Sequence, residues 1–134
     1  GGIPQFGDDR DKGAFIQPSV AVGLSEDATF VKKEVFGPVL HVSPFEGEEE
    51  VIALANDTDY GLATSIWTQN MSRAHRVAPQ IRAGHAWINS WQIRDLMSPL
   101  SGAGLSGIGE QGGRNSLEFS SLPQTITARI FDNE

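Results

Sequence analysis

Residues 39–68, VLHVSPFEGEEEVIALANDTDYGLATSIWT, decide the fold class because they contain a strand, a helix and a second strand in succession. Apolar residues alternate with polar or small ones over Val39–Phe45, which predicts a strand. Glu48–Asn56 predicts a helix, because carboxylates occupy its first turn, where the helix dipole favours them, and an apolar stripe follows. The run ATSIWT, residues 63–68, predicts the second strand.

The chain that follows continues the same alternation. Ser72–Ile81 predicts a second helix, with Ser72 as its N-terminal cap. Pro79 removes a helical hydrogen bond and clashes with the preceding turn, so we expect the helix to kink or stop around Ala78. HAWIN, residues 85–89, predicts another short strand. This order indicates an α/β fold with a partial parallel sheet and crossover helices.

The chain that precedes this region divides into two parts. Residues 1–13 are polar and rich in glycine, so we expect a surface loop or a severed end there. Ala14–Leu24 is rich in apolar and β-branched residues and predicts a strand. Pro18 interrupts it, which favours a bend or an edge position. We take residues 14–122 as one folding unit.

The C-terminal part is less regular. SGAGLSGIGEQGG, residues 101–113, predicts a tight loop, and residues 116–119 predict a short helix. Thr125–Phe131 predicts a final strand, with residues 123–134 forming a strand and tail. No other strand lies near it in the sequence, so we expect it to pair at a sheet edge, in its own chain or across a subunit interface.

The composition excludes several classes of function. The net charge is −7, which disfavours nucleic-acid phosphates and anionic membranes as partners. No apolar run approaches the length that spans a bilayer, so we expect no membrane segment and a cytoplasmic protein. The chain contains no cysteine, which rules out disulfides, thiolate metal sites and a cysteine nucleophile within these residues.

Two other patterns carry little functional weight. The G-x-G-x-x-G spacing occurs twice within residues 102–112, but a dinucleotide-binding fingerprint must follow a strand and open a helix inside a βαβ unit. A structural loop is the better interpretation, because glycine's conformational freedom serves both uses. His41, His75 and His85 lack the spacing of metal ligands, so we expect no metal site.

Three residues remain as candidates for binding. Glu34 and Phe36 lie just before a Gly-Pro turn that leads into a strand, which presents a carboxylate beside an aromatic ring. The alternative is a surface glutamate next to a core phenylalanine. Arg94 follows a strand and lies in a loop, where its guanidinium could hold a carboxylate through two hydrogen bonds. The alternative is an ordinary ion pair with Asp95.

Five segments in fixed order resemble the aldehyde dehydrogenase family, and together they extend from about residue 13 to residue 130. They are FIQPSV, KKEVFGPVLHVSPF, ALANDTDYGLATSIWT, AGHAWIN and PLSGAGLSGIGEQGG. The resemblance implies the C-terminal part of the catalytic domain followed by the oligomerisation strand. It also implies NAD or NADP as cofactor, a small-molecule aldehyde as substrate, and a homo-oligomer assembled through that strand.

The resemblance also assigns roles to individual residues. Glu34 matches the glutamate that holds the nicotinamide ribose hydroxyls, and Phe36 matches the aromatic residue near the nicotinamide ring. Arg94 and Leu100 fall at the substrate tunnel. NSWQIRDL, residues 89–96, is most similar to 2-hydroxymuconic and 2-aminomuconic semialdehyde dehydrogenases, in which this arginine would bind the distal carboxylate of the substrate.

The chain departs from the family pattern in the glycine-rich segment. Leu100 replaces an aromatic wall of the tunnel, and Glu110 stands where the family has an arginine. The family reaction needs a cysteine nucleophile, so the resemblance implies that this chain is inactive alone. The alternative is a stand-alone, non-catalytic assembly module derived from such an enzyme.

Overall fold

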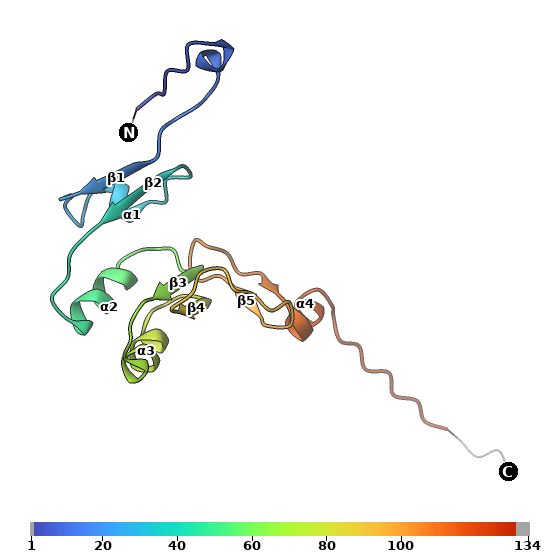
Figure 1. The fold of residues 1–134 in the computed structure, drawn as a ribbon. Helices are drawn as coiled ribbons and strands as arrows, with labels where there is room; N and C mark the ends of the chain where they lie inside the picture. Colours follow the sequence, from blue (N-terminus) through green and yellow to red (C-terminus); the bar gives the residue numbers. More distant parts are fainter. Residues whose placement is uncertain (1, 131–134) are drawn as a thin grey trace.

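The computed structural model describes residues 2–130 and shows an α/β arrangement of short strands and helices (Figure 1). Its elements, in chain order, are η1 (Asp9–Lys12), β1 (Ser19–Val22), α1 (Thr29–Lys32), β2 (Val39–Val42), α2 (Glu48–Asn56), β3 (Ala63–Ile66), α3 (Met71–Val77), η2 (Ala78–Gln80), β4 (His85–Ile88), β5 (Leu100–Ser101), β6 (Glu110–Gln111) and α4 (Gly113–Phe119). The α/β class predicted from the sequence is confirmed.

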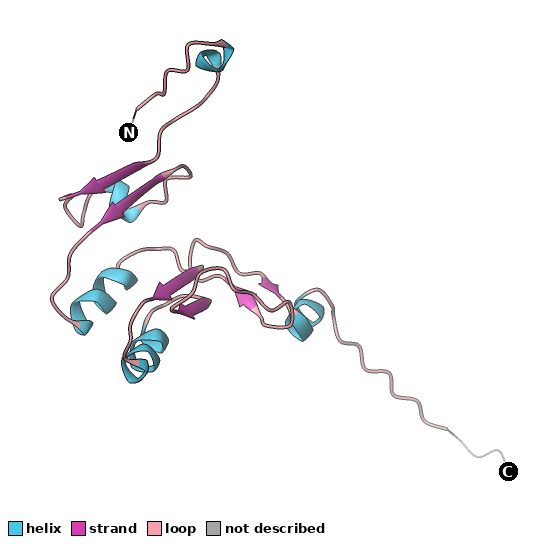
Figure 2. Cartoon of the chain, in the orientation of Figure 1, coloured by secondary structure: helices cyan, strands magenta, loops and turns pink. Residues whose placement is uncertain are grey.

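The described strands form three separate two-stranded sheets (Figure 2). β1 pairs with β2 and β3 pairs with β4, both in parallel, whereas β5 and β6 are antiparallel. The helices α1 and α3 lie in the two parallel connections, as crossovers should. The expected strand order is therefore present, but β2 and β3 belong to different sheets, and α2 connects these sheets instead of crossing over one of them.

The β1–β2 pair has one strongly apolar face. Ser19 pairs with Val39 and the register continues to Val22 and Val42. Burial alternates along both strands, and the more exposed side chains are all aliphatic. These side chains remain between 49% and 69% exposed, and they are Val20, Val22, Leu40 and Val42. β1 begins directly after Pro18, so the strand predicted over Ala14–Leu24 is present only after the proline.

The α3 helix corrects one expectation and confirms another. Its cap is Asn70, whose side-chain oxygen accepts a hydrogen bond from the backbone N of Arg73 at 3.0 Å. The prediction of Ser72 as cap was wrong, because Ser72 lies inside the first turn. The helix ends at Val77 and continues as the 3-10 helix η2, which contains Pro79. The predicted stop around Ala78 is confirmed.

Both ends of the chain differ from expectation. Near the N-terminus, Asp8 caps the short helix η1, and its carboxylate also binds the guanidinium of Arg10. At the other end, residues 121–130 extend away from the rest of the chain and form no strand (Figure 1). Phe131 lies outside the described residues. A strand requires a hydrogen-bonded neighbour. The pairing across a subunit interface that we expected as one alternative needs a second copy of the chain.

The core within this chain is small. Ala74 and Val77 of α3 are its only buried hydrophobic residues among the described part of the chain. The accessible surface is 10930 Å², whereas a compact monomer of 14.5 kDa exposes about 6,900 Å². The chain therefore leaves much of its apolar surface uncovered.

No helix among residues 2–130 combines the length and apolar character needed to cross a bilayer.

Candidate functional site

An open groove of about 730 Å³ runs between the segment of residues 30–36 and the start of β3. Residues 81–83 and 105–106 line the same groove, so four stretches that are far apart in the sequence meet there. Glu34 and Phe36 both belong to its lining. The structure thus places this predicted pair at a cavity.

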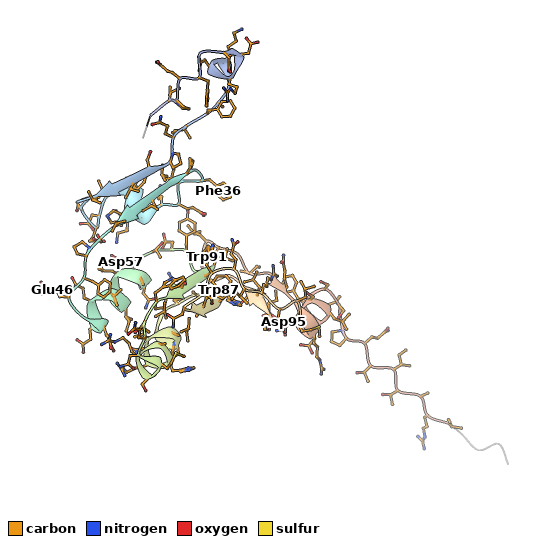
Figure 3. The ribbon with its side chains drawn as sticks, viewed as in Figure 1. Phe36, Glu46, Asp57, Trp87, Trp91 and Asp95 are labelled. Carbon is orange, nitrogen blue, oxygen red and sulfur yellow. The ribbon has the colours of Figure 1, made fainter. Side chains whose placement is uncertain are left out.

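Phe36 is almost fully exposed. Its side chain is 98% accessible, and Figure 3 shows it projecting outward from the loop before β2. The alternative of a core phenylalanine is therefore wrong for this chain. A tight turn holds the loop, because Gly37 donates its backbone N–H to Val35 at 2.8 Å and Val39 donates to Gly37 at 2.8 Å. The ring is presented on a defined loop and is free to stack on a ligand.

Lys32 fastens the Glu34 segment to the end of α2. Its ammonium forms an ion pair with the Asp57 carboxylate and donates to the Asp57 backbone oxygen at 3.2 Å. Lys32 is the last residue of α1, and the loop with Glu34 starts directly after it. The Glu34 carboxylate itself forms no hydrogen bond or ion pair with any described residue, so it is available as an acceptor.

The opposite wall of the groove is held by Asn56. Its side-chain oxygen accepts from the Arg82 backbone N at 2.7 Å, and its amide donates to the Gln80 oxygen at 2.8 Å. The Arg82 guanidinium in turn donates to the Thr58 backbone oxygen. Side chains at the end of α2 therefore fix the chain between η2 and β4.

The glycine-rich segment is joined to the start of β3 by backbone hydrogen bonds. Gly61 accepts from Ala103 at 3.0 Å and from Gly84 at 3.1 Å, and its own N–H donates to the Ser106 hydroxyl at 3.0 Å. Within the segment, a Cβ at Gly104 would lie 2.1 Å from the Asp59 oxygen, and Gly104 has a φ of 58°, so only glycine fits there. Close packing of Gly104 against the chain before β3 supports the structural interpretation of this segment over a phosphate-binding one.

Arg94 lies exposed in the loop between β4 and β5. The Asp95 carboxylate accepts from the backbone N of Met97 at 2.9 Å. Across the described residues, the Arg94 guanidinium forms no ion pair, so the expected alternative of an Arg94–Asp95 pair is not observed. This arginine is available to an external anion.

Arg94 and Leu100 do not line the groove that contains Glu34 and Phe36. Leu100 is partly buried in β5, opposite Gln111. Glu110, at the position of the family arginine, accepts a hydrogen bond from the side-chain amide of Asn115 at 2.9 Å. The predicted cofactor residues and the predicted substrate residues thus occupy separate surfaces of this chain.

One ion-pair cluster was not predicted from the sequence. Glu48, one of the carboxylates in the first turn of the predicted helix, binds Arg76 at 2.6 Å and Arg73 at 2.8 Å and so joins α2 to α3. The guanidinium groups of Arg76 and then Arg73 lower the pKa of Glu48. The cluster borders a second hollow of about 550 Å³ between α2 and β3. Nothing in the local sequence indicates this contact, because the partners lie 25 and 28 residues away.

Comparison with known proteins gives a consistent result. The model of the aldehyde dehydrogenase family matches residues 1–126. The chain is 56% identical, over 97% of its length, to a 2-aminomuconic 6-semialdehyde dehydrogenase of Pseudomonas sp.. It is 48% identical, also over 97% of its length, to a 2-hydroxymuconic semialdehyde dehydrogenase of Pseudomonas putida. The resemblance inferred from the five segments is confirmed.

Solved structures agree with this match. The betaine aldehyde dehydrogenase from Staphylococcus aureus superposes with a TM-score of 0.82 and 38% identity, over 87% of this chain and 23% of that one. The NAD+ complex of an aldehyde dehydrogenase from Bacillus cereus superposes with a TM-score of 0.76 and 44% identity, over 80% and 22%. The chain spans about a quarter of the length of the curated relatives, at 26% and 27% of the two Pseudomonas proteins.

Proposed function

Because this chain belongs to the aldehyde dehydrogenase family, we propose that it forms one wall of the nicotinamide and substrate pockets of an NAD(P)-dependent enzyme. The substrate is a carboxylate-bearing semialdehyde, which the enzyme oxidises to the acid. The observation that carries the proposal is the groove lined by Glu34 and Phe36, since both side chains are presented there without partners in the described chain.

The groove has the chemistry that a nicotinamide riboside requires. The Glu34 carboxylate can accept hydrogen bonds from the two ribose hydroxyls. The exposed ring of Phe36 offers an apolar face against which a flat heterocycle can pack. A nicotinamide held by Glu34 and Phe36 would supply the hydride acceptor that oxidation of an aldehyde requires. A Bacillus cereus relative of similar fold is an NAD+ complex, which supports this assignment.

Arg94 supplies selectivity for the carboxylate that the semialdehyde carries at the end opposite its aldehyde group. A guanidinium binds a carboxylate through two parallel hydrogen bonds, and Arg94 is exposed with no competing anion among the residues described. The relatives named for muconic semialdehydes support this choice of substrate. Leu100, partly buried in β5, contributes an apolar wall to the tunnel near this end.

The nucleophile must come from another part of the polypeptide, because these 134 residues contain no cysteine. We propose that the remaining three quarters of the enzyme cover the apolar faces left open here and bring the thiol to the groove.

We further propose that residues 123–130 pair with a second subunit and that the enzyme is cytoplasmic.

A chimera tests the proposal. Residues 1–130 replace the matching quarter of the Pseudomonas sp. relative, and NADH formation is followed with NAD and a dicarboxylic semialdehyde. The chimera should form NADH, and the 134-residue chain alone should form none. A folded but inactive chimera would favour the non-catalytic assembly module, and turnover by the isolated chain would contradict the need for an external nucleophile.

Substitution of Arg94 tests the substrate assignment. Arg94→Leu should raise the KM of the chimera for the semialdehyde about tenfold to a hundredfold, since hydrogen bonds to a charged group contribute about 1.5–3 kcal/mol. The kcat should change little, because this binding is the same in ground and transition states. Arg114→Leu is the matched control, because Arg114 is exposed and pairs with Glu118 on its own helix. An equal effect of both substitutions would contradict the assignment.

A further inference from the structure

The loop that carries Arg94 is held at its start by Asn89. The Asn89 side-chain oxygen accepts from the Thr68 backbone N at 2.8 Å, and its amide donates to the Thr68 backbone oxygen at 2.8 Å. Asn89 has a φ of 51°, a left-handed conformation that asparagine tolerates better than most residues. Ser65 adds a hydrogen bond of 2.6 Å from its hydroxyl to the Ser90 oxygen. The chain therefore leaves β4 in a fixed direction.

The far end of the loop is fastened as well. Gly113 donates its N–H to the Leu96 oxygen at 3.0 Å. A Cβ on Gly113 would lie 2.5 Å from the Met97 oxygen, so the loop packs directly on a glycine. With both ends held, the remaining freedom lies in the middle of the loop, where Ile93 is 72% exposed.

Among the described residues, one side chain from outside the loop forms a hydrogen bond to its middle, that of Trp87. The indole Nε1–H of Trp87 donates to the backbone oxygen of Ile93 at 2.6 Å. Trp87 is itself held by aromatic neighbours, with ring centroids at 4.3 Å from His85 and 5.2 Å from Trp91. Figure 3 shows Trp87 and Trp91 close together beside β3. These ring contacts therefore restrain the Trp87 donor, one from β4 and one from the loop itself.

We propose that Trp87 is a positioning residue that orients Arg94 toward the substrate carboxylate. The Ile93 oxygen and the Arg94 nitrogen belong to one planar peptide unit, so a hydrogen bond to that oxygen sets the direction in which Arg94 leaves the backbone. Because Ile93 is largely exposed, no packing replaces this bond when it is lost. The proposal rests on the proposed role of Arg94.

The alternative is that Trp87 only stabilises the fold through its ring contacts. Trp87→Phe separates the two roles, because phenylalanine keeps an aromatic ring and lacks the N–H. Site-specific incorporation of 3-benzothienylalanine at position 87 keeps the size of the indole and also lacks the N–H, and it serves if the phenylalanine variant does not fold. Trp91→Phe is the matched control, because Trp91 contacts Trp87 but donates no hydrogen bond to the loop in the described structure.

The chimera described above provides the assay, with two substrates of equal chain length. One is a dicarboxylic semialdehyde and the other an aldehyde without the carboxylate. Loss of the Trp87 donor should raise KM for the semialdehyde about threefold to tenfold, as expected for one neutral hydrogen bond. The kcat for both substrates and the KM for the uncharged aldehyde should stay within about twofold of the unsubstituted chimera.

The outcomes separate this inference from the function on which it rests. If Arg94→Leu raises the semialdehyde KM and the Trp87 variants do not, the inference is overturned and the proposed substrate stands. If the Trp87 variants raise KM equally for both aldehydes, the residue has only a structural role. If Arg94→Leu has no selective effect, or the chimera has no activity, the proposed function fails and the inference fails with it.

Discussion

The β1–β2 and β3–β4 pairs have the same parallel topology and strands of the same length, yet only the second is tied closely to its neighbours. One face of β1–β2 carries four exposed aliphatic side chains. The start of β3–β4 is joined by hydrogen bonds to the glycine-rich segment, and its end is joined to the Arg94 loop. Parallel pairing alone therefore does not bury a sheet, because each apolar face must also pack against other residues. For β1–β2 we expect these residues to come from outside the present chain.

The largest effect should come from the tightly joined region. Gly84→Ala should lower the free energy of unfolding by about 3 kcal/mol, because its Cβ would lie 1.8 Å from the Ser101 backbone oxygen. Urea titration followed by tryptophan fluorescence measures this region selectively, since the three tryptophans are Trp67, Trp87 and Trp91.

Gly109→Ala is the control for that experiment. Nothing lies within 4 Å of a Cβ at Gly109, so its effect should stay within about 0.5 kcal/mol. If Gly84→Ala were as mild as the control, the close contact between the β4 entry and β5 would not contribute to stability, and the contrast between the two regions would be lost.

A smaller effect should appear at the bare face of β1–β2. We expect the isolated chain to self-associate through this face and other exposed strands. Leu40→Lys should weaken the association constant about tenfold, because one exposed leucine side chain would no longer be buried in the contact.

Size-exclusion chromatography with light scattering over a concentration series measures the association. Ala86→Lys, at an exposed position of β4, is the matched control and should have little effect. A clean monomer of the unsubstituted chain at all concentrations would contradict the prediction.

The smallest effect concerns the ion pairs that join α2 to α3. The arginines lower the pKa of Glu48 below its ordinary value of 4.5, so the pairs stabilise the fold above that pH. Their contribution is lost as the pH falls through the lowered pKa. The effect is small because the groups are exposed. In the unsubstituted chain, the urea midpoint should fall as the pH is lowered from about 6 to about 3. In Glu48→Gln this fall should be smaller, because the variant has no ion pairs to lose.

Glu49→Gln provides the comparison for Glu48→Gln. It removes a neighbouring carboxylate that contacts no arginine in the described part of α2 and α3. Identical pH profiles for the Glu48 and Glu49 variants would show that the ion pairs with α3 make no contribution to stability in solution.

Local patterns in the sequence predicted the central elements, from β2 to β4. The acidic start and apolar stripe of Glu48–Asn56 match α2, and Pro79 marks the end of α3. Ser72 failed as a cap because Asn70, two residues earlier, offers a side-chain oxygen in the right place. Helix boundaries depend on such competition between neighbouring capping residues.

Long-range contacts could not be predicted in the same way. The sequence placed Glu34 and Phe36 before a turn, but the groove they line also needs residues 81–83 and 105–106, which the fold brings together. The contacts of Glu48 with α3 and of Trp87 with Ile93 depend on side-chain directions that spacing does not encode. The sequence also could not predict that β2 and β3 belong to different sheets, because the local pattern of a strand does not specify which strand it pairs with.

The most direct test of the central claim is a structure of the chimera with bound NAD+. We predict that the Glu34 carboxylate accepts hydrogen bonds from the nicotinamide ribose hydroxyls and that Phe36 lies against the nicotinamide. A structure with the cofactor bound but with its nicotinamide outside the groove, or with Glu34 directed away from the ribose, would contradict the claim.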